Sequence, residues 1–577
     1  MIIKHVFNKK SIEKESPDPG FLITNRKGSY YSSALNNSRY EGFFINEKEQ
    51  MCKLIDEIMI SKPIKRIINN FSSITLEREN LTQEIYMFKN LNSLICLFDK
   101  HTVIEFLFDV KKSFDNRNFG RYYKIYEEKN KIIIQFEKKT SNLENEQEGR
   151  PEYSMYIVIN LATYSLPNQW IKRSYSYDRE RNSMPYDRYV YHGLKVIANK
   201  LIVSASHDKH SAIKENDYIM KNLDKLIKNH FVYIKNLLRK FNHKNKEIDF
   251  ALKCSVNSLD QLSTENGVIA GLPWFFQHWA RDELFCTKAL YSFNKNLAVQ
   301  ILNKYTNSLA KHGSIFSNKE SGLIAKDAIG LLVLRSEELK EGNYKLILFL
   351  NSPNKHPIPL HNNALETWMD TSVANSSREG YRIEIQALQL RILKILYILT
   401  KEKYMKDLEG QLIKYVRENF YTGKILKDGI NDFSIRPNIF LAYYFYNEFL
   451  SKKEWNKIID NSLPNIWNDW GGFSSIEKTS PLFQPSYTGE NNLSYHHGDS
   501  WFFLNNMAAI CMHQLNKNKY KKYINKIITA SVQDILWQGY IGFHSELSSS
   551  SELKAQGCKA QSWSSALFIE LIRELKK

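Results

Sequence analysis

The sequence predicts a two-part chain, in which an N-terminal antiparallel β-sandwich is followed by an all-α domain of paired helices. Residues 1–209 contain short β-branched and aromatic runs between polar turns, such as 102–110, and this pattern is typical of sandwich strands. Apolar residues recur at helical spacing through 246–577, for example over 381–400. The segment 210–245 has the same spacing with almost no helix breakers, and it predicts a linker helix between the two domains.

The arrangement of the helical half follows from its loops and from the absence of a repeat. About a dozen candidate helices fit within 246–577, separated by long polar loops rich in Trp, Asn, Gly and acidic residues. No repeat with a period of roughly 30–45 residues occurs, which favours a closed barrel of helical hairpins over a solenoid. Loops at one end of such a barrel build a pocket.

Composition and charge are those of an ordinary globular protein. Hydrophobic residues make up 43% of the 577 residues, which supports large cores and excludes global disorder. The net charge of +18 comes mostly from lysines spread along the chain, without a basic tail, zinc-finger or RNP-like motif. We therefore interpret the charge as a solvated surface, and nucleic-acid binding is an alternative that rests on charge alone.

Cysteine usage and hydropathy predict a cytoplasmic location. The six cysteines include no CxxC pair, so we expect them to be reduced and mostly buried. The apolar start of the chain is too short for a secretory signal, and no run approaches the ~20 apolar residues of a membrane span. We expect neither a membrane nor a nucleic-acid partner.

Three loop segments combine tryptophan with charged residues just before apolar helices. In GLPWFFQHWARDELF (271–285), two Trp flank Asp282, which is either a helix cap or an acid whose pKa is raised by apolar neighbours. The segments 362–388 and 487–506 hold further acidic, basic and aromatic residues, and a fourth, HSELSSSSELKAQGCKAQSW (544–563), adds two glutamates. The adjacent histidines in 487–506 lack the spacing of a metal site.

This inventory favours a neutral, polyhydroxylated ligand. The loops supply carboxylates and Trp, without a phosphate-binding glycine loop, a metal motif or a GxSxG nucleophile. Glycoside hydrolysis needs two carboxyl groups, one to protonate the leaving oxygen and one to activate water or attack the sugar. The carboxylates in these loops fit that requirement, and we expect no cofactor.

The same segments resemble the glycogen debranching enzymes of the archaeal and bacterial amylo-α-1,6-glucosidase type. The resemblance is carried, in order, by PWFFQHWARDELF, ETWMD, REGYRIEIQAL, SIRPN, YHHGDSW and GCKAQSWS, and by the N-terminal FLITNRKGSYYSSALNNSRYEGFFI. It implies a β-sandwich followed by a glucoamylase-like, six-hairpin α/α barrel. It also implies inverting removal of α-1,6-linked glucose at branch points of glycogen or a related α-glucan, in a pathway with a separate glucanotransferase or phosphorylase.

The resemblance also assigns residues. Asp282 would be the general acid and Glu546 the general base, while Glu552 would be a solvated rim residue. The residues carried over to the substrate site are Trp279, Arg281, Trp368, Asp370, Arg378, Glu384, Tyr495, His497, Asp499, Trp501, Gln561 and Trp563. No metal ligand is implied.

Two departures from the family and two alternatives accompany this assignment. Ala280 replaces a family glycine, which would strain the backbone if that position requires a positive φ. The loop after Glu546 is rich in serine, unlike that of the family. The alternatives are another exo-acting α-glucosidase of the same barrel, glucoamylase-like or trehalase-like, and a non-catalytic α-glucan-binding protein.

Overall fold

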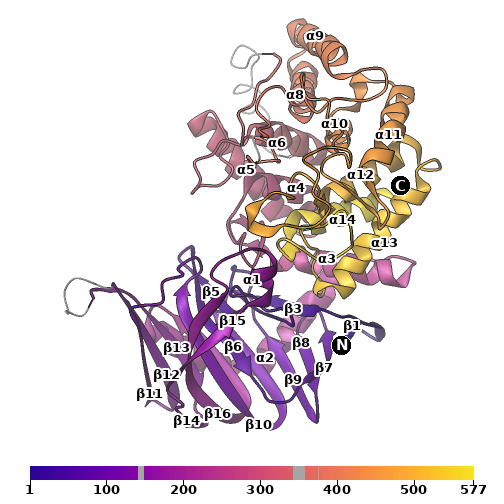
Figure 1. Ribbon diagram of the computed structural model, residues 1–577. Coiled ribbons are helices and arrows are strands. Elements are labelled where there is room, and N and C mark those ends of the chain that lie inside the picture. Colours follow the sequence, from indigo (N-terminus) through magenta and orange to yellow (C-terminus); the bar gives the residue numbers. More distant parts are fainter. Residues whose placement is uncertain (141–148, 342–357, 374–375) are drawn as a thin grey trace. The chain divides into compact units, whose positions relative to one another are not determined.

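The computed structural model consists of two compact units. It describes residues 1–140, 149–341, 358–373 and 376–577. Unit 1 comprises 1–264 and 536–542, and unit 2 comprises 265–535 and 543–577 (Figure 1). Unit 1 is built on strands and unit 2 on helices, as the sequence predicts. Across the described residues, every helix is too short or too polar to cross a lipid bilayer.

Apart from the short β17 (Ser263–Thr264), the described strands of unit 1 form one hydrogen-bonded sheet. They are β1 (Ile2–Phe7), β2 (Lys10–Glu15), β3 (Pro19–Thr24), β4 (Tyr30–Ala34), β5 (Gly42–Glu47), β6 (Gln50–Met59), β7 (Ile64–Asn69), β8 (Ile74–Arg78), β9 (Leu81–Tyr86), β10 (Ser93–Lys112), β11 (Arg121–Glu128), β12 (Lys131–Lys139), β13 (Pro151–Asn160), β14 (Thr163–Ser165), β15 (Gln169–Ser174), β16 (Asp187–Ser206) and β23 (Gly539–Tyr540).

Two long strands, β10 and β16, join the branches of this sheet. The series β2–β1–β7–β8–β9 leads into the first part of β10, and β3–β4–β5–β6 leads into its second part. The register of β10 against β16 shifts between Leu97 and Thr102, where β10 changes its second partner. Strands that change partners at such irregularities form the corners of sandwiches. The pairings β1–β7 and β3–β23 are parallel, so the predicted antiparallel sheet is in fact mixed.

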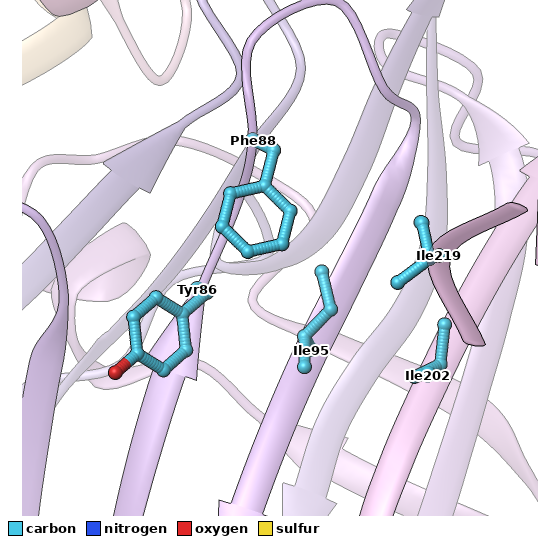
Figure 2. Close-up of a cluster of buried hydrophobic side chains, with 5 residues drawn as sticks. All are labelled: Tyr86, Phe88, Ile95, Ile202 and Ile219. Carbon is cyan, nitrogen blue, oxygen red and sulfur yellow. The ribbon is translucent and has the colours of Figure 1, made fainter. Parts of the chain in front are cut away.

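The predicted linker helix belongs to unit 1. Helix α2 (Lys209–Leu238) contacts β13 and β16, and its apolar face packs against the sheet. Figure 2 shows the resulting cluster of Tyr86, Phe88, Ile95, Ile202 and Ile219, the last of which comes from α2. Because this face is buried on the strands, α2 covers the sheet instead of spanning two domains. The unit boundary falls after Thr264, not at the predicted residues 209 and 245.

Other segments outside the predicted β-domain also join unit 1. Helix α3 (Lys246–Gln261) is tied to the β3 end, because Arg26 pairs with Asp260 at 2.6 Å. The segment 536–542 adds β23 alongside β3, and the His5 ring contacts the Leu536 carbonyl at 2.8 Å. A short helix, α1 (Ser176–Glu180), completes the unit.

Six helices of unit 2 close a ring. They are α4 (Ala280–Tyr291), α6 (Lys326–Leu339), α8 (Ile383–Thr400), α10 (Asn438–Phe445), α12 (Phe502–Asn516) and α14 (Ser562–Glu574), and each contacts the next, with α14 returning to α4. Around them lie α5 (Lys295–His312), α9 (Lys403–Phe420) and α11 (Lys452–Ile466), against α4, α8 and α12 respectively, and α13 (Lys521–Trp537) precedes the last loop. This is the predicted α/α barrel (Figure 1).

Sequence pattern explains which helices are inner and which are outer. Helix α8, IEIQALQLRILKILYILT, is buried on nearly every side through its first four turns. Helix α9 buries only Met405, Leu408, Leu412, Val416 and Phe420, which form a single stripe. A helix that is apolar all round belongs in an interior, whereas a stripe faces one neighbour. The distribution of apolar residues along each helix therefore explains why α8 lies in the inner ring and α9 lies outside it.

Short strand pairs connect the loops that lead into the inner helices. Strand β19 (Gly271–Leu272) pairs with β25 (Ala560–Gln561), and β22 (Ser500–Trp501) pairs with β24 (Leu547–Ser548). Another pair joins β20 (Trp467–Asn468) to β21 (Gly472–Phe473). The first two pairs hold loops that are far apart in the sequence beside one another.

Candidate active site

The predicted site residues gather at the N-terminal ends of the inner helices of unit 2. Arg281 and Asp282 lie in the first turn of α4, Glu384 lies in the first turn of α8, Trp501 precedes α12, and Gln561 precedes α14. The N-terminal end of a helix carries partial positive charge, which favours nearby carboxylates. A ring of such ends suits a site rich in acidic groups.

Asp282 is a buried acid held by an amide. Its side chain is nearly inaccessible, and Gln561 Nε2 donates a hydrogen bond to Oδ1 at 2.9 Å. Burial raises the pKa of Asp282 to about 8, and the charge of Glu546 adds to this, against the opposing effects of Gln561 and Arg281. Asp282 is therefore mainly protonated at neutral pH and can donate a proton.

Glu546 is held as an acceptor by two donors. Tyr495 Oη donates to Oε1 at 2.5 Å, and the backbone N–H of Cys558 donates to Oε2 at 2.8 Å. Its own backbone N–H donates to the Cys558 carbonyl at 2.8 Å, and its carbonyl accepts from Phe502 N. Both carboxyl oxygens of Glu546 therefore already accept hydrogen bonds from the protein. The two buried carboxyls therefore have contrasting surroundings.

Arg281, the residue before Asp282, bonds two other carboxylates, Asp327 and Asp370. Its Nε lies 2.8 Å from both oxygens of Asp327, and its Nη1 lies 3.1 Å from Asp370 Oδ2. The Asp370 side chain is 31% exposed, so it can accept hydrogen bonds from a ligand. Asp327 was missed from the sequence, although its place in the first turn of α6 is the same signal that drew attention to Asp282.

Three of the predicted tryptophans form a buried aromatic wall. Trp501 stacks on His496 with ring centroids 5.3 Å apart, and Trp563 stacks on Phe503 at 4.1 Å. Trp368 meets Trp501 edge to face at 5.4 Å. All three are under 7% exposed, so their main contacts are with the protein. These three side chains therefore support the structure around the site.

Trp279 differs from the other three. It is half-buried, and it lies at the end of a run of half-buried residues that begins at Trp274. Its ring meets Phe275 edge to face at 6.2 Å. Trp279 therefore has the surface needed to contact a ligand.

Arg378 and Glu384 belong to a buried ionic network. Arg378 bonds Glu384 Oε1 at 2.6 Å and Asp428 Oδ1 at 2.9 Å. Burial would raise the pKa of Asp428, but the charges of Arg378, Arg436 and Arg382 outweigh it and lower the pKa to about 2. This network fixes the loops before α8 and α10. Asp428 was missed because LKDGIND reads as a surface turn.

His497 and Asp499 secure the loop before α12. The Nε2 atom of His497 lies 2.8 Å from Ser376 Oγ. Asp499 is fully buried and accepts a hydrogen bond from Ser494 Oγ at 2.7 Å. Burial, with a smaller effect of the charge on Glu546, raises the pKa of Asp499 to about 8.

The departures from the family pattern have simple structural outcomes. Ala280 starts helix α4 as a buried residue and has no left-handed backbone. Glu552 is exposed, as expected for a rim residue. The serines are structural, since Ser548 Oγ bonds the Glu552 carbonyl at 2.7 Å and Ser550 Oγ bonds the Gly498 carbonyl.

The six cysteines are all buried and free, as predicted. None of them contributes a side chain to the carboxyl contacts described above. Cys558 acts through its backbone N–H on Glu546, while its thiol donates to the Leu272 carbonyl at 3.0 Å.

Comparisons with known proteins give a family match and a shared fold. Residues 359–570 match the amylo-alpha-1,6-glucosidase family, a range that includes Glu546 and begins after Asp282. The fold is similar to that of a bacterial glucoamylase complexed with acarbose, at 13% identity and a TM-score of 0.61, over 99% of this chain and 97% of that chain. A wild-type glycosidase is similar at 10% identity and a TM-score of 0.43, over 58% of this chain and 99% of that one.

No curated protein sequence matches the chain. The family match covers the part of the barrel from α8 to α14, which carries Glu546, and the shared fold extends over both units. The chain is a glycoside hydrolase in which residues 359–570 match the amylo-alpha-1,6-glucosidase family, and its fold is a glucoamylase-like α/α toroid.

Proposed function

We propose that this hydrolase removes α-1,6-linked glucose at branch points of glycogen or a related α-glucan, with inversion of configuration. The observation that carries the proposal is the contrast between two buried carboxyls. Asp282 has a pKa near 8 because it is buried close to another charge, whereas Glu546 accepts hydrogen bonds at both oxygens. Unequal environments of this kind separate an acid from a base.

In this mechanism the two carboxyls act on opposite faces of the sugar. Asp282 protonates the glycosidic oxygen as the bond to C1 breaks. Glu546 removes a proton from a water molecule whose oxygen attacks C1 from the other face, which requires roughly 6.5–9.5 Å between the carboxyls. At the end Asp282 is ionised and Glu546 is protonated, and exchange with solvent restores both.

The remaining polar groups are suited to hold the glucose unit. Asp370, fixed by Arg281 and partly exposed, is an acceptor for sugar hydroxyls. Trp279 offers a half-exposed apolar face for the ring. We assign substrate contact to these residues before the buried Trp368, Trp501 and Trp563.

The proposal also specifies which glycosidic linkage is cleaved. The match to the amylo-alpha-1,6-glucosidase family supports the α-1,6 bond, and such an enzyme would act on chains shortened by a glucanotransferase or phosphorylase. The fold similarity to a glucoamylase supports, as a second candidate, an exo-acting α-glucosidase of another linkage. A panel of α-1,6, α-1,4 and α,α-1,1 glucosides distinguishes them, and a preference for either of the last two refutes the debranching assignment.

The catalytic assignment is tested by Asp282→Asn and Glu546→Gln, with Glu552→Gln as the matched control. Each of the first two should lower kcat by about 10²–10⁴-fold, the range of general acid–base catalysis, while the control remains near wild type. NMR of the first-formed sugar should show the β anomer. An α anomer excludes inversion, and an inactive Glu552→Gln beside an active Glu546→Gln reverses the base assignment.

A further inference from the structure

We propose that segment 557–561, GCKAQ, is a shared positioning element for both carboxyls, in which the Gln561 amide keeps the acid proton of Asp282 on Oδ2. The inference rests on the proposed function, in which Asp282 is the acid and Glu546 the base. It changes the role of Gln561, which the sequence assigns to the substrate. The segment touches one carboxyl at each of its ends.

At the end of this segment, Gln561 controls Asp282. Its Nε2 donates to Oδ1 at 2.9 Å, between residues 279 positions apart in the chain. If Oδ1 carried the acid hydrogen on the side of this N–H, the two hydrogens would point at each other and the hydrogen bond could not form. The neutral carboxyl therefore carries its hydrogen on Oδ2, and the oxygen that donates to a leaving group is fixed before substrate binds.

At the start of the segment, Gly557 and Cys558 control Glu546. The N–H of Cys558 donates to Glu546 Oε2 at 2.8 Å. Gly557 has a φ of +64°, and a side-chain carbon there would collide with the same Oε2. Glycine is required both by this left-handed backbone and by the close approach of the carboxylate.

The segment is anchored independently of either carboxyl side chain. Gln561 N donates to the His544 carbonyl at 2.8 Å, and Ser562 N donates to the Ala270 carbonyl at 2.8 Å. The Cys558 thiol donates to the Leu272 carbonyl at 3.0 Å. Strand β25 is thereby held between the loop of the acid and the loop of the base. Segment 557–561 therefore contacts both carboxyls through one short piece of backbone.

Gln561 has no room for a substrate contact. The residue is 2% exposed, and its Oε1 packs against the backbone of Gly271 in the adjacent strand β19. The Nε2 end of the amide is directed at Asp282, and the Oε1 end is buried without a hydrogen-bond partner among the described residues. It acts through Asp282, and is a positioning residue.

The test compares Gln561→Met with Gln556→Met. Met keeps the length of glutamine without the donor, and Gln556 is a buried glutamine of the same loop whose Oε1 accepts from Ser549 N at 2.8 Å. For Gln561→Met we expect kcat on an α-1,6 substrate to fall about 10–100-fold, with KM within about twofold. In the pH profile of kcat, the alkaline limb should move to higher pH by about one unit, because the lost Gln561 donor favoured the ionised form of Asp282.

The control should leave the alkaline limb unchanged even if it destabilises the loop. A raised KM with unchanged kcat in Gln561→Met means that Gln561 contacts substrate, and an unmoved alkaline limb refutes control of Asp282. Either result overturns the proposal.

A second readout does not require activity. The unfolding midpoint of wild type and of Gln561→Met is measured from pH 5 to 10, and the pH-dependent fall in stability should extend about one unit further in the variant. If neither protein hydrolyses any α-glucan, the proposed function fails while this titration still tests the contact. Identical titrations refute the positioning role whatever the activity.

Discussion

Replacing Asp282 by Asn should make this protein more stable at neutral and alkaline pH while it lowers kcat by about 10²–10⁴-fold. Asn keeps the shape of the side chain and leaves an oxygen to accept from Gln561 Nε2. What it removes is the ability to ionise. The variant gains stability because the folded protein opposes the charge of Asp282, mainly through burial and also through the charge of Glu546.

The size and sign of the effect follow from the pKa of this carboxyl. It rises from 3.8 to about 8 on folding, so between these values the folded state holds a proton that the unfolded state has lost. The stability of the wild type therefore falls as pH rises through this window, by about 1.4 kcal/mol per pH unit. The advantage of Asp282→Asn should grow to about 3 kcal/mol near pH 6 and level off above pH 8, at no more than about 6 kcal/mol.

The assay is thermal or urea unfolding of the wild type and the variant at five pH values from 5 to 9. Glu283→Gln is the matched control, since Glu283 is the next residue of the same helix turn and its pKa shifts in the opposite direction. Burial would raise that pKa, but the hydrogen bond from His278 and the charge of Lys304 hold it below its usual value. Glu283→Gln should therefore lose stability, by about 3–5 kcal/mol, across the whole range.

The reasoning is refuted if Asp282→Asn is less stable than the wild type at pH 8, or if its advantage is the same at pH 5 and pH 8. The first result would mean that the ionised carboxyl is stabilised by its neighbours. The second would mean that the difference comes from packing and not from titration.

Two further substitutions test other contacts. Gly557→Ala should lower kcat at least tenfold with an unchanged far-UV circular dichroism spectrum, because its methyl group would displace the Glu546 carboxylate, and near-wild-type kcat would contradict the close approach. Asp428→Asn should lower the free energy of unfolding by about 3–5 kcal/mol, since it leaves a cluster of buried arginines without their shared partner. A loss below about 1 kcal/mol, equal to that of the partly exposed Asp432→Asn, would show that the network is not a stabilising hub.

Much of the site could be predicted from the sequence, because the local pattern of apolar and polar residues reflects how each segment is buried. The burial of α8 on nearly every side and the single stripe of α9 follow directly from where their apolar residues recur. The candidate acid and base came from motifs beside tryptophans. Asp327 carried the same helix-start signal as Asp282 and could have been included.

Other features had no local signal. Asp428 lies in a stretch that reads as a turn, and it becomes the centre of an ionic network only when α8 and α10 are adjacent. Helix α2 has the spacing of any amphipathic helix, and nothing in that spacing says whether it covers a sheet or joins two domains.

The sequence by itself determined the two-part architecture and the apolar faces that the helices must bury, while its resemblance to a known family suggested the two carboxyls proposed for catalysis. Periodicity and composition are properties of neighbouring residues, and they dictate which faces must be buried. Only the tertiary structure decided that Gln561 serves Asp282 and that Cys558 serves Glu546. The first of these contacts joins residues 279 positions apart, and it exists because the ring closes α14 against α4.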